Sequence, residues 1–155
     1  MRGMEWHITP ATSADLPALL ALLGQVGLPE AGLAQHLATA LVARSAGALI
    51  GSAALELYGG TALLRSVAVA PGWRGRGIGR ALTDAASALA LCHGVRRLVL
   101  LTTTAAPWFL AAGWVPLERD MVDAAVRQSI QFTSACPASA SVLLRQLDAV
   151  GGAAG

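Results

Sequence analysis

The sequence predicts a single α/β domain built on a mixed, mostly antiparallel sheet. Its 155 residues are 55% apolar and 13% charged, which suits one domain with a substantial hydrophobic core. A two-residue hairpin signal, Gly59-Gly60, separates two long strand patterns in the first half. In the second half a strand leads through a glycine-rich turn into an amphipathic helix and then to the continuous apolar run 98–101. That order is typical of a crossover between parallel, buried strands.

The N-terminal part of the chain predicts a strand, a capped helix and the first strands of the sheet. Thr12 and Asp15 have the spacing of a capping box, and Pro17 suits the first helical turn. Gly27 is expected to end that helix, and a second helix of poorer pattern follows over residues 33–37. The strands expected here cover residues 6–10, 40–44, 48–58 and 61–69.

The rest of the chain predicts three helices and three strands. The long helix begins after the glycine-rich turn, ends at Gly94 and places Cys92 on its buried face. Its expected apolar stripe consists of Ile78, Leu82, Ala85, Leu89 and Cys92. Further strands are expected at 98–101, 114–117 and 142–147, and further helices at 105–112 and 121–130. The domain would then occupy residues 1–148, with a flexible tail of small residues at 149–155.

Composition excludes several classes of chemistry. All eleven basic residues are arginine, which excludes a Walker-type phosphate loop, Schiff-base chemistry and a lysine general base. A net charge of +2 does not predict nucleic-acid binding, and the longest apolar runs, 46–55 and 105–115, are too short for a membrane span. Two cysteines suit a reduced, cytoplasmic setting, and the surplus of apolar residues predicts a homodimer.

The segment 74–80 carries the main functional signal, because glycines and arginines lead directly into a helix. A helix N-terminus presents unpaired N–H groups and partial positive charge, and glycine lets a phosphate approach the backbone closely. A pyrophosphate-bearing ligand is therefore predicted. A dinucleotide fingerprint is excluded, since Arg80 stands where its third glycine is needed. Two alternatives stay open: a glycine-rich turn without a ligand, and an arginine–glycine box that binds RNA.

The same segment resembles a known family. Arg74-x-x-Gly77-x-Gly79 resembles the Q/R-x-x-G-x-G/A signature of the GNAT N-acetyltransferase superfamily, and Pro71 before it matches the family surroundings. The stretches 100–105 and 132–140 resemble the arsenic-resistance-associated branch of that superfamily. The resemblance implies a sheet splayed between its fourth and fifth strands, with acetyl-CoA as co-substrate in the cleft.

By that resemblance, the chain transfers acetyl directly to the amine of a small molecule, either amino-acid-like or an arsenic-containing analogue. Backbone groups of the fourth strand would hold the pantetheine arm, and the glycine-rich turn would hold the pyrophosphate. The cofactor-binding residues so implied are Val67, Ala68, Val69, Arg74, Gly75, Arg76, Gly77, Ile78, Gly79 and Arg80. The alternative function is a catalytically silent module that binds acyl-CoA or regulates a partner.

Two residues are candidates for catalysis. Family members often use a glutamate as base and a tyrosine as acid, but Phe109 stands where that tyrosine is expected. Glu56 is therefore the candidate base, and Tyr58 the candidate acid. A tight hairpin would place both on one sheet face with Arg65 and Val67, unless a bulge near residue 67 shifts the register. The alternative interpretation is that Glu56 and Arg65 form an ion pair on a solvated face.

The acceptor is expected to be amino-acid-like. Deprotonating an amine of pKa about 10.4 at pH 7 costs about 4–5 kcal/mol, whereas an α-amino group near 8 costs only about 1–2 kcal/mol. Arg65 or Arg127 is expected to hold the carboxylate, and Thr103 to line the cleft. Cys136 is a nucleophile, an arsenical ligand or a packed thiol. The histidines share no metal-ligand spacing, so no metal is predicted.

Overall fold

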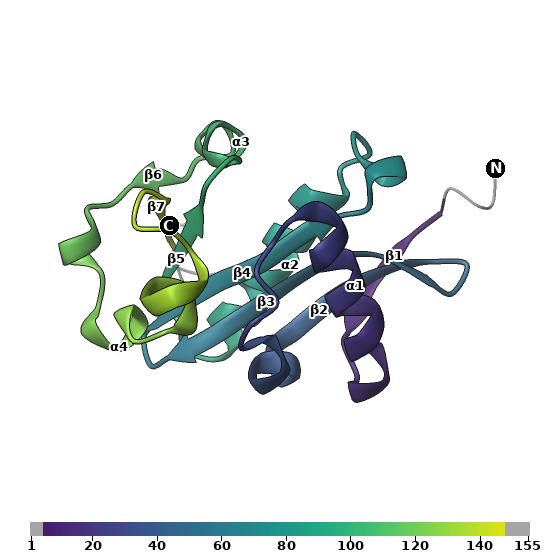
Figure 1. Ribbon diagram of the computed structural model, residues 1–155, viewed down its shortest axis with the longest axis horizontal. Coiled ribbons are helices and arrows are strands. Elements are labelled where there is room, and N and C mark those ends of the chain that lie inside the picture. Colours follow the sequence, from purple (N-terminus) through teal and green to yellow (C-terminus); the bar gives the residue numbers. More distant parts are fainter. Residues whose placement is uncertain (1–4, 148–155) are drawn as a thin grey trace, which may run out of the picture.

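The computed structural model describes residues 5–147, whose strands form one seven-stranded sheet (Figure 1). The order across the sheet is β1-β2-β3-β4-β5-β7-β6, and of the described pairs only β4 with β5 is parallel. The strands are β1 His7–Pro10, β2 Ala40–Ser45, β3 Ala48–Tyr58, β4 Thr61–Val69, β5 Arg97–Thr102, β6 Val115–Pro116 and β7 Ser141–Gln146. The predicted mixed, mostly antiparallel sheet is confirmed, and the tail predicted at 149–155 lies outside the described residues.

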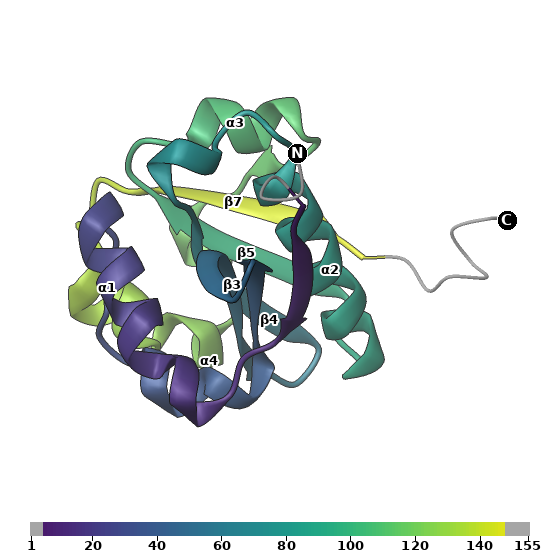
Figure 2. The ribbon, with the colours of Figure 1, turned by 90° about the vertical axis from the view of Figure 1, so that its right-hand side faces the viewer.

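Helices cover both faces of the sheet. They are α1 Leu16–Val26, α2 Ile78–Cys92, α3 Ala106–Ala111 and α4 Ala124–Arg127. The long helix α2 packs on one face across β2, β3 and β4, whereas α1 and the short α4 lie on the other face (Figures 1 and 2). A 3₁₀ segment, Leu33–Thr39, leads from the α1 side into β2.

Alternation along the central strands divides the core into two layers. On β3, Leu55 belongs to the layer under α2, while its neighbour Ala54 packs in the layer under α1. A third cluster forms where α4 covers the junction of β4 and β5, with Val126, Leu63 and Val99 all buried. The strands β4 and β5 are therefore buried on both faces, as the apolar run 98–101 predicted.

The structure differs from two predictions about helices. Cys92 is exposed, and the buried face of α2 is the row Ile78, Leu82, Ala86 and Ala90 at four-residue spacing. Alanine and leucine lie on several sides of this helix, so the sequence had too little contrast between apolar and polar positions to show which side is buried. The helix expected at 121–130 is reduced to α4, because Asp123 accepts hydrogen bonds from Thr61 (2.5 Å) and Arg97 (3.5 Å) and ties the segment to the sheet.

Replacing Asp15 with Asn is expected to destabilise the fold by about 1–2 kcal/mol at pH 7. Asp15 completes the capping box with Thr12 and accepts a hydrogen bond from Arg44 Nη2 at 2.6 Å. The Arg44 hydrogen bond, together with those from Thr12, lowers the pKa of Asp15 to about 2. Urea unfolding at several pH values tests this, with Asp84→Asn, at an exposed site, as the control.

Because the folded pKa of Asp15 lies below the unfolded value, its stabilisation is present above pH ~4 and is lost as pH falls toward 2. The wild type and the Asp15→Asn variant should therefore converge in stability over that interval. A difference that stays constant from pH 7 to pH 2 would contradict the assignment.

A β-bulge in β4 sets the geometry of the site. Pairing of Glu56 with Leu63 and of Tyr58 with Thr61 matches the predicted hairpin register, but the register shifts between Ser52 and Ala54 of β3. Opposite this point Ser66 adopts φ +60°, and its carbonyl accepts a 2.7 Å hydrogen bond from Ser52 Oγ. An extra residue in one strand turns the following side chains to the other face.

The bulge determines where two of the expected residues lie. Val67 packs against the cluster under α2, whereas Arg65 lies on the opposite face with Glu56. The two residues were expected to share a face unless a bulge near residue 67 shifted the register, and the bulge at Ser66 is that exception.

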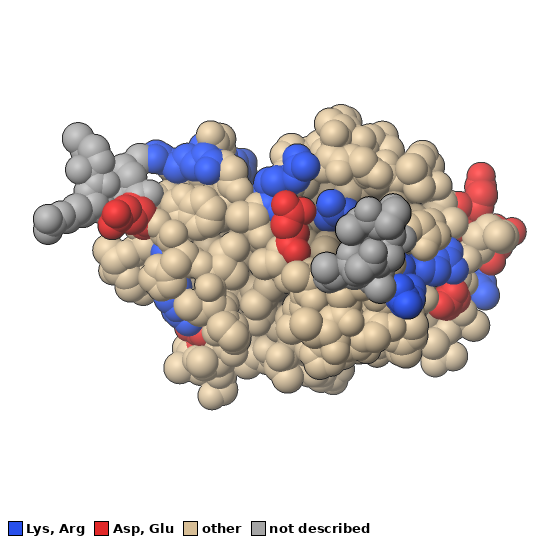
Figure 3. Space-filling view, turned by 180° about the vertical axis from the view of Figure 1, so that it is seen from behind, with Lys and Arg blue, Asp and Glu red and all other residues tan. Residues whose placement is uncertain are grey.

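Charged side chains are a minority on the face shown in Figure 3. Within residues 5–147 no helix is long and apolar enough to cross a membrane, and no three potential metal-ligating side chains gather. The large apolar side chains exposed in this part of the chain are Trp108, Leu110, Val115, Met121 and Ile130. The homodimer expected from composition stays a prediction.

Candidate functional site

A cleft opens where β4 and β5 separate. The two strands pair only over Thr61–Leu63 and Arg97–Val99, so beyond Leu63 the β5-facing edge of β4 has no ladder partner among the described residues. A bulged strand twists and bends more strongly, which accounts for the divergence. A cavity of about 780 Å³ lies along the end of β4, between the glycine-rich turn and the segment that follows β5. The predicted splay between the fourth and fifth strands is confirmed.

The glycine-rich turn forms one end of this cavity. Gly77 caps α2 at φ +83°, and Gly75 has φ +80°, conformations that favour glycine. A Cβ at either position would meet no protein atom within 4 Å, so the backbone faces open space. Arg74 and Arg80 line the same end, and Arg74 Nε donates to the Val69 carbonyl at 3.2 Å. The cavity therefore ends at a positively charged helix N-terminus.

Aromatic side chains form another part of the cavity lining, and the Trp108 ring lies against Gly79 in the first turn of α2. Trp108 and Phe109 pack edge to face with their ring centroids 4.8 Å apart, and Phe109 packs in the same way on Trp114. Trp73 lines the cavity from the glycine-rich side, and Leu28 closes it from the end of α1. The cavity thus combines an apolar body with one cationic end.

A second cavity of about 200 Å³ adjoins the first. The two share the wall residues Leu28, Val67, Thr104, Ala105 and Phe109. The second cavity also has a polar lining, formed by Arg65, Ser66, Thr102, Thr103, Gln131 and Cys136. A long ligand in the first cavity would thus have one end beside a small polar chamber.

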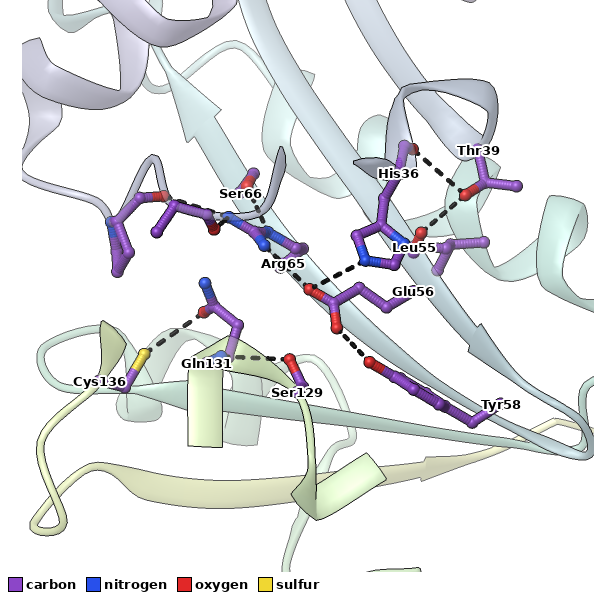
Figure 4. A network of polar contacts seen from close by, with 12 residues as sticks. His36, Thr39, Leu55, Glu56, Tyr58, Arg65, Ser66, Ser129, Gln131 and Cys136 are labelled. Carbon is purple, nitrogen blue, oxygen red and sulfur yellow. Dashed lines mark hydrogen bonds and ion pairs between the residues drawn. The ribbon is translucent and has the colours of Figure 1, made fainter. Parts of the chain in front are cut away.

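Beneath this chamber lies a buried ion pair (Figure 4). Arg65 Nη1 donates to Glu56 Oε2 at 2.9 Å, and both side chains are only 1% exposed. Tyr58 donates to Glu56 Oε1 at 2.6 Å, and His36 Nε2 lies 3.8 Å from Oε2. Burial raises the pKa of Glu56, but hydrogen bonds from Ser129, Tyr58 and Arg65 outweigh it, and the pKa falls below its ordinary value. Glu56 is therefore a carboxylate at neutral pH.

A family model described as the acetyltransferase (GNAT) domain matches residues 36–116, more than half of the chain. This chain belongs to the GNAT acetyltransferase family. The match spans β2 to β6 and includes the whole glycine-rich turn. The comparison with curated proteins returned no match.

Solved structures share the GNAT fold across nearly the whole chain. N-acetylglutamate synthase from Neisseria gonorrhoeae, complexed with coenzyme A and N-acetyl-glutamate, has a TM-score of 0.81 and 24% identity over 94% of this chain and 36% of its own. The protein Rv2747 from Mycobacterium tuberculosis, in complex with CoA, has a TM-score of 0.77 and 23% identity, and the match covers 92% of this chain and 99% of its own. A GNAT acetyltransferase from Staphylococcus aureus has a TM-score of 0.74 and 14% identity, and the match covers 93% of this chain and 100% of its own. The chain spans about a third of the length of the synthase.

Nine of the ten residues predicted to bind the co-substrate of a GNAT enzyme line the large cavity. Arg76 does not line it: its guanidinium lies 5.0 Å from the centre of the Trp73 ring and donates to the Gly72 carbonyl at 3.4 Å. A stacked arginine at this place supports the tryptophan that does line the cavity.

The structure does not bring the predicted catalytic pair to the cavities. Glu56 and Tyr58 line neither one. Burial, followed by the interaction with Glu56, raises the pKa of Tyr58 to about 12, and its hydroxyl already donates to that carboxylate. A carboxylate of lowered pKa is a poor base for an amine, and such a tyrosine is a poor acid for a thiolate. The expected solvated ion pair is wrong too, because the pair is fully buried.

The predicted acceptor residues divide into two groups. Thr103 and Cys136 line the small chamber, whereas Arg127 is exposed on α4 and lines neither cavity. Arg65 reaches the chamber wall, but its three nitrogens already donate to protein atoms: Nε to Ser66, Nη1 to Glu56 and Nη2 to the Ala31 carbonyl. The expected arginine clamp for a carboxylate is therefore not preformed.

Cys136 is a half-buried thiol with a defined partner. Its Sγ lies 3.3 Å from Gln131 Oε1. Burial raises the pKa of Cys136, against the opposing charges of Arg65 and Arg119. A thiol of raised pKa does not supply the thiolate that a nucleophile needs at neutral pH.

Gln131, Ser129 and Ser66 were not singled out in the sequence. Gln131 begins a short π turn, and Ser129 accepts a hydrogen bond from its backbone N–H. Ser66 lies in the bulge of β4. None of the three positions follows a periodic pattern or a turn signature, so single-residue spacing carried no signal for them.

Proposed function

We propose that this GNAT protein is an acetyl-CoA-dependent N-acetyltransferase that acts directly on the amine of a small, amino-acid-like molecule. The observation that carries the proposal is the junction of two cavities: a long one with a glycine-lined cationic end, and a short polar chamber at its other end. The first suits a pyrophosphate-bearing thioester, and the second suits a small acceptor beside the acyl group.

The large cavity suits acetyl-CoA by the chemistry of its lining. The unpaired β5-facing edge of β4 over residues 67–69 offers backbone groups to the amides of the pantetheine arm. The amides before and within the first turn of α2 offer donors to the pyrophosphate, with Arg74 and Arg80 beside them. Similar GNAT structures complexed with coenzyme A support this assignment.

The reaction needs positioning more than acid–base groups. The acceptor nitrogen attacks the thioester carbonyl carbon, the C–N bond forms as the C–S bond breaks, and CoA leaves as a thiolate that takes up the proton released by the amine. The unpaired N–H groups of β4 stabilise the oxyanion that develops. Since Glu56 lies outside both cavities, the amine enters already deprotonated, which favours an α-amino group.

We assign Glu56 a positioning role. It fixes Arg65 at the chamber wall through the 2.9 Å ion pair, and Tyr58 and His36 in turn hold the carboxylate. The ordered guanidinium supplies positive potential to the chamber, although its donors are used within the protein. Val67, Ala68, Val69 and the turn 74–80 remain the proposed co-substrate site.

Incubation of the protein with acetyl-CoA and a panel of amino acids and amines, read by mass spectrometry of the acetylated product, tests the proposal. Detection of free thiol is less suitable because Cys92 is exposed. Acetylation of α-amino acids, and no acetylation of lysine-type side-chain amines, is the expected result. Binding of acetyl-CoA without acetylation of any amine would favour the second candidate function.

That second candidate is a silent acyl-CoA-binding module. It is favoured by one observation: Phe109, buried on the wall of both cavities, has no proton to donate to a leaving thiolate. The arsenic-containing acceptor, the cytoplasmic location and the homodimer remain predictions of the sequence.

The pH dependence of kcat/KM is expected to follow the acceptor and not the enzyme. Below the pKa of the acceptor amine, kcat/KM should rise tenfold per pH unit, because only the neutral amine attacks. When acceptors with different amine pKa values are compared, the rising part of the kcat/KM profile should shift along the pH axis by the difference between those pKa values. A limb that stays fixed for all acceptors and disappears in Glu56→Gln would show that Glu56 is the base after all.

A further inference from the structure

We propose that Gln131 is the residue that recognises the acceptor, through a hydrogen bond from its amide nitrogen to a carboxylate or carbonyl oxygen of that molecule. This inference rests on the proposed function. Gln131 lines the small chamber and is only 6% exposed. Its Nε2 has no hydrogen-bond partner among the described residues.

The neighbouring cysteine fixes which end of the amide faces the ligand. Gln131 Oε1 accepts from Cys136 Sγ at 3.3 Å, so the amide oxygen is occupied on that side (Figure 4). The amide nitrogen is thereby turned away from Cys136, with both of its hydrogens unused. The Gln131 backbone N–H donates to Ser129 Oγ at 3.1 Å, which also anchors the residue where the π turn begins. The side chain is thus held in one orientation before any ligand binds.

A buried donor without a partner calls for an acceptor atom. Nearly all buried polar groups in native proteins are hydrogen-bonded, and an amide nitrogen can only donate. The other strong donor at the chamber, Arg65, has each nitrogen engaged within the protein. Gln131 therefore presents a buried nitrogen that is without a hydrogen-bond partner among the described residues, at a chamber that Arg65 also lines. An anionic oxygen on the ligand would accept the hydrogen bond from Gln131 and would also be attracted by the positive charge of Arg65.

The chamber's position explains how this contact would act. Residues Val67, Thr104 and Phe109 belong to both cavities and mark the junction where the acyl group would lie. An acceptor held at its carboxylate by Gln131 leaves its amine free to point toward that junction. Orientation of this kind is what direct transfer requires, since the nitrogen must face the thioester carbon.

Steady-state kinetics of Gln131→Glu and Gln131→Ala test the assignment, with α-amino acids and their α-amides as paired acceptors. Gln131→Glu keeps the shape but replaces the donor with a negative acceptor, and it should raise the KM of the amino acid about 100-fold. Gln131→Ala should raise it about tenfold. The KM of acetyl-CoA should change less than twofold. In Gln131→Glu the KM of the α-amide should rise much less than the KM of the amino acid.

Variants of the cysteine test the orientation of the amide. Cys136→Ala removes the donor to Oε1 and should raise the acceptor KM several-fold, and Cys136→Ser, which restores a donor at that place, should recover most of this loss. The proposal would be overturned if Gln131→Glu left the acceptor KM unchanged, or if it raised the KM of the amino acid and of its α-amide equally. Acetylation of amines that lack an α-carboxylate, together with no acetylation of α-amino acids, would also overturn it. Failure to bind acetyl-CoA at all would instead remove the proposed function.

Discussion

Gly77→Asp is expected to weaken acetyl-CoA binding about 100-fold, while Gly77→Asn retains most of it. Both side chains are good helix N-caps, and both tolerate the left-handed conformation that Gly77 adopts at φ +83°. They differ only in charge. A carboxylate about 5–6 Å from a phosphate costs about 3 kcal/mol at an effective dielectric constant of about 20, which is about a hundredfold in affinity.

Isothermal titration of both variants with acetyl-CoA measures this difference, and urea unfolding shows whether each remains folded. A Cβ at position 77 would meet no protein atom within 4 Å, so neither variant creates a clash. Equal affinities for the Asp and Asn variants would place the pyrophosphate elsewhere. High salt should narrow the difference, since screening weakens the repulsion.

Arg65→Met is expected to destabilise the fold by about 3–5 kcal/mol at pH 7, the range for leaving a buried charge without its partner. Arg65 and Glu56 are each 1% exposed, and the guanidinium also donates to the Ala31 carbonyl that positions the chain after α1. Arg127→Met is the matched control, because Arg127 is exposed. It should change the free energy of unfolding by less than about 0.5 kcal/mol.

A double-mutant cycle separates the ion pair from simple loss of packing. Glu56→Gln with Arg65→Met removes both charges, and it should be less destabilised at neutral pH than Arg65→Met alone. In Arg65→Met the unpaired Glu56 favours its protonated form, so its deficit should shrink as pH falls toward 4. Additive single effects, or a deficit independent of pH, would show that the pair is energetically unimportant.

The parts of the fold that follow periodic patterns could be predicted from the sequence. The hairpin at Gly59-Gly60, the register of Glu56 with Leu63 and the start of α2 at Ile78 are all as expected, because each depends on local turn chemistry or alternation. The glycine-rich turn was also correctly predicted to open a helix, since helix capping and glycine backbone freedom are local properties. Its place at the end of a cleft was expected from the resemblance to the GNAT superfamily.

The acceptor side could not be predicted, because it depends on tertiary placement. The bulge at Ser66 sends Val67 and Arg65 to opposite faces, and no alternation pattern shows where the extra residue lies. The surroundings of Glu56 depend in part on Ser129, which lies far along the chain just before the π turn and hydrogen-bonds the carboxylate. Charge and spacing alone suggested a base, whereas the hydrogen bonds around Glu56 are the observation behind the positioning role that we propose for it.

Titration of the full chain with acetyl-CoA, with CoA and ADP as comparison ligands, tests the central claim most directly. Micromolar binding of acetyl-CoA and CoA is expected, with much poorer binding of ADP, which lacks the pantetheine arm proposed to lie along β4. Binding should decrease strongly in Gly77→Asp and only slightly in Gly77→Asn. No binding of acetyl-CoA up to millimolar concentration would contradict the assignment of the cleft between β4 and β5.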